Sequence, residues 1–282
     1  MDSTEYRRQS LNTWNTLAPT WDERSEQIGE PVAPVRDRML ELLGAQAGET
    51  LLDIACGAGE MTELLSPVVG DSGHLICTDF APQMVDAARR RGEQAGLANA
   101  EYREMDAEHM DLDDASVDGA VCRFGYMLMA DRAAALGETR RVLRDGGRVV
   151  FAVWAEPQRN PWVLVPGSVL IERGVMPFPD PDGPGIFALG EPSKIDATVA
   201  EAGLTADMID SVDIHHHIAG PDALWERVTQ TMGPLATAIA EQPPAEQAEI
   251  RAATLERAEP FREGDGYHLP GAAYVVLAKP AA

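Results

Sequence analysis

The segment Leu51–Glu60, LLDIACGAGE, constrains the fold of this chain more than any other. An apolar run that ends in an acid and then in glycines predicts a buried strand that enters a tight turn. The residues after it, Met61–Leu65, favour a helix, which we expect to end at Ser66-Pro67. A strand, a glycine turn and a helix in this order indicate the nucleotide-binding start of an open α/β sheet.

The two glycines of the turn, Gly57 and Gly59, allow positive φ angles and let backbone N–H groups approach a ligand closely. Dinucleotide-binding folds carry a third glycine, where this chain has Thr62. Asp53 ends the strand and faces the turn, and its carboxylate would repel a pyrophosphate but attract an ammonium or a sulfonium group. An NAD-dependent oxidoreductase is therefore the less favoured interpretation.

Two further acids follow predicted strands at the spacing of successive βα units. The strand His74–Thr78 ends in Asp79, 22 residues beyond Gly57, and a strand around Glu101–Met105 ends in Asp106. The carboxyl ends of parallel strands meet at one edge of a sheet, so these carboxylates are expected to lie near Asp53. The alternative is that all three are solvated turn residues, but their joint spacing argues against it.

LLDIACGAGE and the later acids resemble the class I S-adenosylmethionine-dependent methyltransferases. The segment Ala133–Trp154 is similar to the small-molecule branch of that family, the ubiquinone/menaquinone-biosynthesis type, whose usual R-P-G-G turn has Asp145 in place of proline here. The resemblance covers residues 35–155 strongly and the remainder in outline. It implies a three-layer, Rossmann-like α/β fold whose seven-stranded, mostly parallel sheet has the order 3-2-1-4-5-7-6, with helical cap insertions.

The resemblance also implies which residues bind the cofactor, S-adenosyl-L-methionine. Asp79 would accept hydrogen bonds from the ribose hydroxyls, and Asp106 with Ala107 would hold the adenine amine. Phe80 would cover one face of the adenosine, whereas Met84 is either an adenine contact or an ordinary core residue. The candidate cofactor-binding residues are Asp53, Ala55, Cys56, Gly57, Gly59, Asp79, Phe80, Met84, Asp106, Ala107, Arg123 and Phe124.

The fourth predicted strand, Gly119–Cys122, ends where the donor and acceptor of this family meet. The implied reaction is in-line transfer of the sulfonium methyl group to an O, N or C nucleophile, which requires positioning and exclusion of water. A non-catalytic protein that binds the donor is the alternative. Side chains assigned to this cleft predict a small, apolar or aromatic acceptor: Trp14, Trp21, Tyr126, Met127 and Trp154.

No residue identifies itself as a catalytic base, and His109, His217 and His268 are weak candidates. His217 belongs to a run of three histidines, 215–217, on a predicted strand. Alternate residues of a strand face opposite sides, so the run does not supply three convergent ligands. We therefore expect no metal site.

The charge of −23, from 46 acids and 23 bases, argues against a nucleic-acid partner and favours a neutral or cationic acceptor. There is no run of 18 apolar residues and no charged-then-apolar leader, so no membrane association or secretion is expected. The three cysteines, Cys56, Cys77 and Cys122, fall in or beside buried strands. They predict a reducing, cytoplasmic location, while the oligomeric state is left open.

The chain of 282 residues allows one large domain with a cap. Residues 1–34 are predicted to form a helical lid, although a helix that only packs its tryptophans on the domain fits equally well. Residues 35–155 form the predicted cofactor-binding core, and the Pro-rich segment 156–192 is expected to lie over the cleft. Residues 193–282 complete the sheet and include a predicted helical cap at 221–262.

Overall fold

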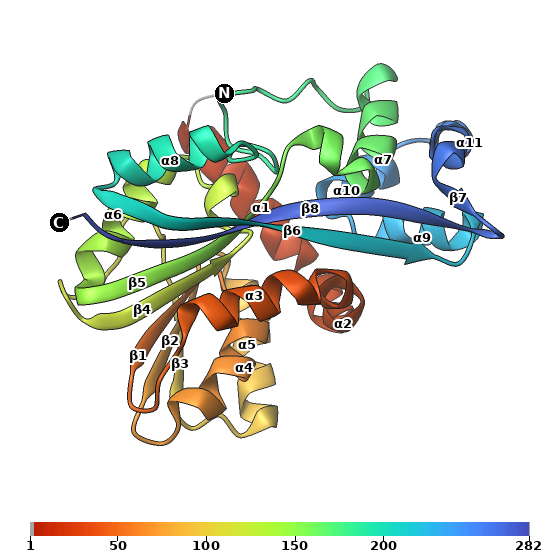
Figure 1. The fold of residues 1–282 in the computed structure, drawn as a ribbon. Coiled ribbons are helices and arrows are strands. Elements are labelled where there is room, and N and C mark those ends of the chain that lie inside the picture. The colour runs from red at the N-terminus through yellow and green to blue at the C-terminus, as the bar shows by residue number, and fades with distance from the viewer. Residues whose placement is uncertain (1–2, 282) are drawn as a thin grey trace.

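A mixed β-sheet runs through the protein, with helices on both of its faces (Figure 1). The structure is a computed structural model that describes residues 3–281. The strand order is β3-β2-β1-β4-β5-β8-β6, and a two-residue strand, β7, pairs with β8. The strands are β1 Thr50–Ile54, β2 His74–Asp79, β3 Ala100–Glu104, β4 Val117–Arg123, β5 Leu143–Trp154, β6 Leu204–Ile218, β7 Arg262–Glu263 and β8 Gly266–Pro280.

The sheet confirms the predicted topology, because β8 takes the place of the seventh strand once the short β7 is set aside. Strands β1 to β5 pair in parallel, whereas β8 inserts antiparallel between β5 and β6. Parallel strands need crossover helices, so the carboxyl ends of β1, β2, β3 and β4 all meet at one edge. Any ligand bound by the loops after these strands lies at that edge.

Helices α3, α4 and α5 cover one face of the sheet, and α6 and α8 cover the other (Figure 1). Helices α9, α10 and α11 follow β6 and pack, together with α7, against the far ends of β6 and β8. The α-helices are α1 Ser3–Glu23, α2 Ser25–Gly29, α3 Ala33–Leu43, α4 Glu60–Val69, α5 Pro82–Ala95, α6 Arg132–Val142, α7 Pro161–Glu172, α8 Pro192–Glu201, α9 Pro221–Gln230, α10 Pro234–Ala240 and α11 Pro244–Ala258. The 3-10 helices are η1 Glu30–Val32, η2 Tyr126–Leu128, η3 Pro157–Arg159 and η4 Glu259–Phe261.

Two prolines lie inside helices, and at one of them, Pro67, the helix was predicted to end. Helix α4 continues through Pro67 to Val69, and the N–H of Gly70 donates to the carbonyl of Ser66 at 3.1 Å. Helix α1 likewise continues through Pro19. A proline removes one intrahelical hydrogen bond, but the buried side chain of Val69 holds the last turn of α4 on the core. The predicted end of α4 at Ser66-Pro67 was therefore wrong.

Helix α8 begins without a side-chain cap. Glu191 occupies the N-cap, and its side chain makes no capping hydrogen bond. Pro192 lies in the first turn, where its missing N–H costs little.

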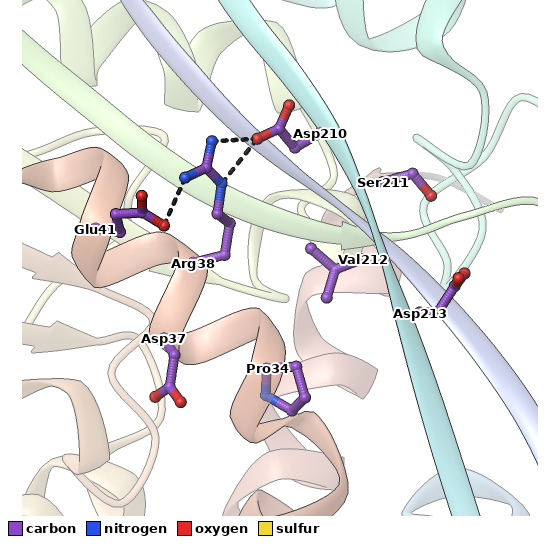
Figure 2. A pocket seen from close by; sticks show the side chains of 8 residues that line it. All are labelled: Pro34, Asp37, Arg38, Glu41, Asp210, Ser211, Val212 and Asp213. Atoms are coloured by element: carbon purple, nitrogen blue, oxygen red, sulfur yellow. Dashed lines mark hydrogen bonds and ion pairs between the residues drawn. The ribbon is translucent and has the colours of Figure 1, made fainter.

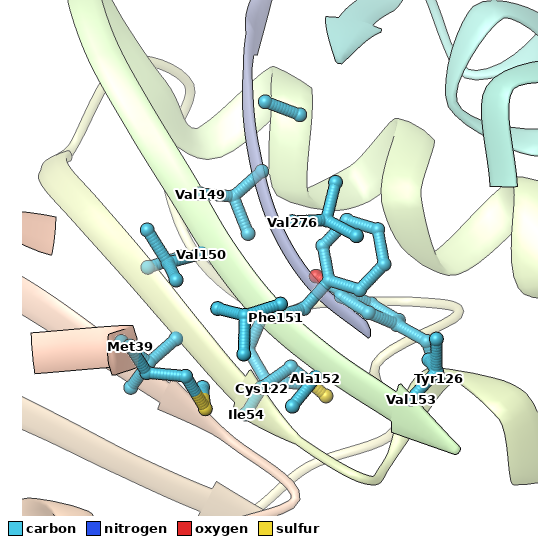
Figure 3. Packing of buried hydrophobic residues seen from close by; sticks show 14 of the residues in the cluster. Met39, Ile54, Cys122, Tyr126, Val149, Val150, Phe151, Ala152, Val153 and Val276 are labelled. Carbon is cyan, nitrogen blue, oxygen red and sulfur yellow. The ribbon is translucent and has the colours of Figure 1, made fainter. Parts of the chain in front are cut away.

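The main core lies where β5 and β4 cross the middle of the sheet (Figure 3). Phe151 of β5 packs edge to face with Tyr126 on the α6 side of the sheet, whereas Met39 of α3 lies on the opposite face of the same apolar cluster. Near-continuous burial along β5 matches a strand with helices on both faces. A second apolar cluster joins the cap helices to α7, through residues such as Leu170, Leu224 and Ile250. Within residues 3–281, no helix combines the length and apolar composition needed to cross a membrane.

Asn160 fixes the chain where β5 leaves the sheet. Its side-chain amide donates to the carbonyls of Ala155 and Ala272, and its Oδ1 accepts from the N–H of Ala272 and from the indole of Trp162. Asn160 is fully buried, so its side chain ties α7 to β8 in a water-free setting.

Substitution Asn160→Ala is expected to lower the free energy of unfolding by roughly 2–4 kcal/mol, because several buried backbone groups lose their partners. Urea denaturation followed by tryptophan fluorescence measures the change. The exposed Asn12 of α1 supplies the control Asn12→Ala, which should change stability by less than about 0.5 kcal/mol. Equal stability of the two variants would contradict this role of Asn160.

Candidate functional site

The glycines after β1 have different structural roles. Gly57 has φ +53°, and a Cβ added to it would meet no atom within 4 Å. Gly59 has φ +84° and caps α4, and an added Cβ would lie 3.1 Å from the Cβ of Ala88 on α5. Gly59 therefore permits helix packing, whereas Gly57 leaves backbone accessible to a ligand.

Asp53 is buried at the end of β1, with 2% of its surface exposed. Thr62, fully buried on α4, donates its hydroxyl to Oδ2 of Asp53 at 2.8 Å. Burial raises the pKa of Asp53 to about 7, while the hydrogen bond from Thr62 and the charge of Arg123 oppose the shift. The sequence analysis gave Thr62 no role; the only signal was a hydroxyl at the position of the missing third glycine.

Asp79 is the second buried carboxylate, and it connects two loops. Its Oδ2 accepts from the N–H of Gly57 at 3.1 Å, and its Oδ1 accepts from the N–H of Ala81 at 2.9 Å. Burial raises the pKa of Asp79 to about 6, although these backbone hydrogen bonds oppose the shift. Since β1 and β2 are parallel neighbours, Asp53 and Asp79 flank the same turn.

A narrow cavity of about 80 Å³ lies against the glycine turn. Its floor includes Asp53 and Gly57, and helices α1 and α2 close it with Trp21 and Ile28. Of the predicted cofactor-binding residues, Asp53, Ala55, Cys56, Gly57 and Arg123 line it. Small-molecule sites usually have roughly 300–1,000 Å³. The cavity is therefore smaller than a usual small-molecule site.

Two arginines line the cavity beside these acids. Arg91 donates to Glu63 at 2.6 Å and to the hydroxyl of Ser25 at 3.0 Å, so its charge is already matched. Arg123 pairs with Glu60 at 2.6 Å, and Glu60 is shared with Arg36 of α3 at 3.2 Å. The cavity thus offers both a buried carboxylate and a guanidinium, the two charges that a zwitterion requires.

The N-terminal helix α1 lies across the carboxyl edge of the sheet and is tied to three other segments of the chain. The hydroxyl of Tyr6 donates to the carbonyl of Leu128 at 2.7 Å, and Arg7 pairs with the buried Glu108. Farther along, Asp22 of α1 pairs with Arg90 of α5 at 2.9 Å. None of these contacts could be predicted from local sequence patterns, because they join residues far apart in the chain.

The predicted residues Trp14, Trp21, Phe80 and Met84 come together in one apolar cluster under α1. The rings of Trp14 and Trp21 meet edge to face at 5.4 Å. Phe80 and Met84 lie outside the lining of the cavity, as do Asp79 and Asp106. Asp106 follows β3 and accepts from the N–H of Glu108 at 2.9 Å, so its loop meets the start of α1.

On the other side of the glycine turn, aromatic rings line up from β4 toward the cap. Phe124 adopts φ +62°, which is unusual for a non-glycine residue, and its ring stacks on Trp154 at 4.4 Å. Trp154 in turn contacts Trp162 of α7 at 4.7 Å. Trp162 was not predicted as a site residue.

Two of the predicted acceptor-pocket residues lie elsewhere. Tyr126 is 0% exposed, its hydroxyl lies 2.7 Å from that of Thr139 on α6, and its ring packs edge-on against Phe151 (Figure 3). Met127 is buried in the same core. Neither side chain lines the cavity beside the glycine turn, so the structure gives no support to their assignment to the acceptor pocket.

The histidines predicted as weak bases lie away from the glycine turn. His215, His217 and His268 form a group on β6 and β8, with the rings of His217 and His268 stacked at 4.6 Å. His109 is exposed beside Asp106. Among the described residues, no three histidine, cysteine or acidic side chains are grouped so as to hold a metal ion. The thiols of Cys56, Cys77 and Cys122 are free.

An open groove of about 530 Å³ lies between α3 and β6 (Figure 2). Arg38 crosses it and pairs with Glu41 at 2.6 Å and with Asp210 at 2.5 Å. The guanidinium is therefore already satisfied by acids of the groove itself. The groove contains none of the loop residues at the carboxyl edge, so the smaller cavity is the stronger candidate for chemistry.

Comparison with known proteins identifies the central part of the chain. Residues 51–147 match the family model of a methyltransferase domain. Over 160 residues the chain is 26% identical to the ubiquinone/menaquinone biosynthesis C-methyltransferase UbiE of Saccharophagus degradans, covering 56% of this chain and 64% of that protein. Over 143 residues it is 34% identical to the demethylmenaquinone methyltransferase of Thermus thermophilus, covering 51% of this chain and 63% of that protein.

A solved structure shares the fold. The crystal structure of a Bacillus halodurans protein aligns with a TM-score of 0.60 and 20% identity, covering 88% of this chain and 99% of that chain. The chain spans less than two thirds of the length of the two curated relatives. Together these matches confirm the family resemblance predicted from the sequence.

The raised pKa of Asp53 predicts how stability depends on pH. Between about pH 4 and 7 the folded state holds a proton that the unfolded chain has lost, so the free energy of unfolding falls as pH rises through this range. The variant Asp53→Asn has no such carboxyl group to deprotonate. Its free energy of unfolding should therefore exceed that of the native protein by roughly 2–4 kcal/mol at pH 8, but not near pH 4. Urea unfolding across this pH range, with the exposed Asp71→Asn as control, measures the difference. Parallel profiles for Asp53→Asn and the native protein would contradict the burial of this charge.

Proposed function

We propose that this chain, whose residues 51–147 are a class I S-adenosylmethionine-dependent methyltransferase domain, transfers the sulfonium methyl group to a small aromatic acceptor. The observation that carries the proposal is the buried carboxylate of Asp53, held by Thr62 beside the glycine turn. A desolvated carboxylate gains most from a cationic ligand and opposes a pyrophosphate. An oxidoreductase that binds NAD is therefore disfavoured on physical grounds.

In this proposal the cofactor lies along the carboxyl ends of β1, β2 and β3. Its ammonium group faces Asp53, and its ribose hydroxyls reach Asp79. Asp79 already accepts two backbone hydrogen bonds, but each carboxylate oxygen has a second lone pair for a hydroxyl donor. Asp106 with Ala107 would take the adenine amine. Phe80 and Met84 provide apolar contacts for the adenosine only after α1 shifts, since they now pack beneath it.

Arg123 supplies the partner for the carboxylate of the cofactor. In the closed structure Glu60 occupies its guanidinium, and Arg36 holds the other oxygen of Glu60. An incoming carboxylate can replace Glu60 on Arg123, because Arg36 still neutralises the displaced acid. Asp53 and Arg123 together would recognise the zwitterionic amino-acid end.

Helices α1 and α2 act as the lid in this proposal. The cavity of about 80 Å³ is too small for the cofactor, and Trp21, Ser25 and Ile28 of these helices close it. The lid must open for binding, and its return excludes water from the reaction.

The acceptor would lie against Phe124 and Trp154, which stack at the end of β4 and β5. The names of the two relatives, both methyltransferases of quinone biosynthesis, support an aromatic acceptor and make carbon one of the candidate nucleophiles. We assign no general base. The acidic charge supports a substrate other than nucleic acid, and the three free thiols support a reducing, cytoplasmic location.

Calorimetric titration with S-adenosylhomocysteine and with NADH tests the proposal. Binding of the former and not of the latter is expected. Methyl transfer from labelled S-adenosylmethionine to a panel of aromatic acceptors then separates an enzyme from a protein that only binds the cofactor. Preferential binding of NADH would refute the proposal.

Substitution Asp79→Asn should weaken the binding of S-adenosylhomocysteine by about 1–3 kcal/mol, because the charge-assisted hydrogen bonds to the ribose are lost. The same loss is expected for 5′-methylthioadenosine, which keeps the ribose. Calorimetry measures both, with the exposed Asp111→Asn as control. Unchanged affinity in Asp79→Asn would mean that the ribose binds elsewhere.

The role of Arg123 predicts opposite effects of two substitutions. Arg123→Gln should weaken the binding of S-adenosylhomocysteine by about 1.5–3 kcal/mol. Glu60→Gln should strengthen that binding, because it removes the carboxylate that competes for Arg123. Neither change should affect 5′-methylthioadenosine, which lacks the amino-acid group. Glu63→Gln, which breaks the ion pair of Arg91, is the matched control. Equal losses for both ligands in Arg123→Gln would contradict the assignment.

A further inference from the structure

The line of aromatic rings that starts at Phe124 ends on a histidine and an arginine. Trp162 contacts the ring of His216 at 5.1 Å, and Arg227 of α9 donates to Nδ1 of His216 at 2.8 Å. His216 faces this side of β6, away from the exposed group formed by His215, His217 and His268. The sequence analysis assigned no function to Arg227.

Arg227 is half-buried and has no acidic partner within residues 3–281. Neighbouring acids of α9 are used elsewhere, since Asp222 pairs with Arg251, and Glu226 lies 3.7 Å from Arg24. Burial lowers the pKa of Arg227, and no carboxylate lies near enough to oppose the shift. Nearly every other arginine that is similarly buried, such as Arg91 or Arg148, is matched by an acid. A guanidinium in this setting gains from an added anion.

His216 presents a second donor beside it. Its Nδ1 accepts from Arg227, which places the ring proton on Nε2, and Nε2 is buried without a hydrogen-bond partner. His216 is 2% exposed, and burial lowers its pKa to about 3, so the ring stays neutral over the working pH range. A buried N–H without an acceptor is costly, and a ligand oxygen would remove that cost.

The helix that carries Arg227 also borders the lid. Arg24, which follows α1, pairs with Glu226, and a Cβ added at Gly233 would lie 3.4 Å from Leu17 of α1. The part of the cap that carries Arg227 therefore contacts α1, one of the helices that close the cofactor cavity.

We propose that Arg227 and His216 form the anion subsite of the methyl acceptor, and that the acceptor is a planar aromatic monocarboxylate. This inference rests on the proposed methyltransferase function. The ring of the acceptor would extend along Trp154 and Trp162, with one end near the donor at Phe124 and its carboxylate on Arg227 and the Nε2–H of His216.

The assignment of an anionic acceptor rests on the local charge of Arg227 and not on the net charge of the protein. The net charge of −23 favoured a neutral or cationic acceptor, but one half-buried, unmatched arginine balances one negative charge. A dianionic phosphate would leave an excess charge close to Glu226 and Asp222. A guanidinium fork also matches a carboxylate geometrically.

The test compares 2-naphthoate with 2-naphthamide, which has the same ring and no charge. Binding is followed by tryptophan fluorescence in the presence of saturating S-adenosylhomocysteine, whose own binding is measured by calorimetry on the same sample. The native protein is expected to prefer the carboxylate by about tenfold or more. Arg227→Gln should abolish that preference, Arg227→Lys should restore part of it, and His216→Phe should reduce it. Arg251→Gln, which removes another cap arginine, is the control.

The outcomes separate this inference from the proposed function. If S-adenosylhomocysteine binds but the amide binds as tightly as the carboxylate, or neither naphthalene binds at millimolar concentration, the anion subsite is refuted and the cofactor site stands. If Arg227→Gln and Arg251→Gln lower carboxylate affinity equally, the effect is general electrostatics, and the subsite is again refuted. Failure of S-adenosylhomocysteine to bind refutes the proposed function itself.

Discussion

The hydrogen bond between Thr62 and the desolvated carboxylate of Asp53 is the interaction on which the candidate site depends. It fixes α4 to the end of β1. It also holds the buried carboxylate of Asp53 at the edge of the sheet, where no cation among residues 3–281 forms an ion pair with it. Arg123 is near enough to lower the pKa of Asp53, but it is committed to Glu60. In the proposed function, the ammonium group of the cofactor would supply a positive charge at Asp53, and its carboxylate would replace Glu60 on Arg123.

The sheet order and the cofactor loops could be predicted because they depend on local pattern. Apolar runs, the glycine turn and the acids at strand ends all lie within a few residues of one another, and the crossover rule for parallel strands then places Asp53 and Asp79 at one edge. The position of β8 followed from the family resemblance. Phe124 and Trp154 stack on each other because β4 and β5 are neighbouring strands, and their roles in the site stay predictions.

What the sequence could not provide depends on contacts between distant segments. Tyr126 lies only two residues after Phe124. The 3-10 helix η2 nevertheless places its side chain in the core, where its hydroxyl forms a hydrogen bond with that of Thr139. Arg227 is one of many arginines in the chain, and only the fold shows that it has no acidic partner among residues 3–281. Helix α4 passes Pro67 because tertiary burial outweighs one lost hydrogen bond.

The contacts that hold α1 at the edge of the sheet have a kinetic consequence. The pair between Asp22 and Arg90 is partly exposed, so dissolved ions weaken it, while the bond from Tyr6 to the carbonyl of Leu128 is more sheltered. The two ends of the helix should then loosen unequally, with the end near Trp21 opening first. Ligand entry would begin at the amino-acid end of the cleft, and ionic strength would set the rate of association more than the equilibrium affinity.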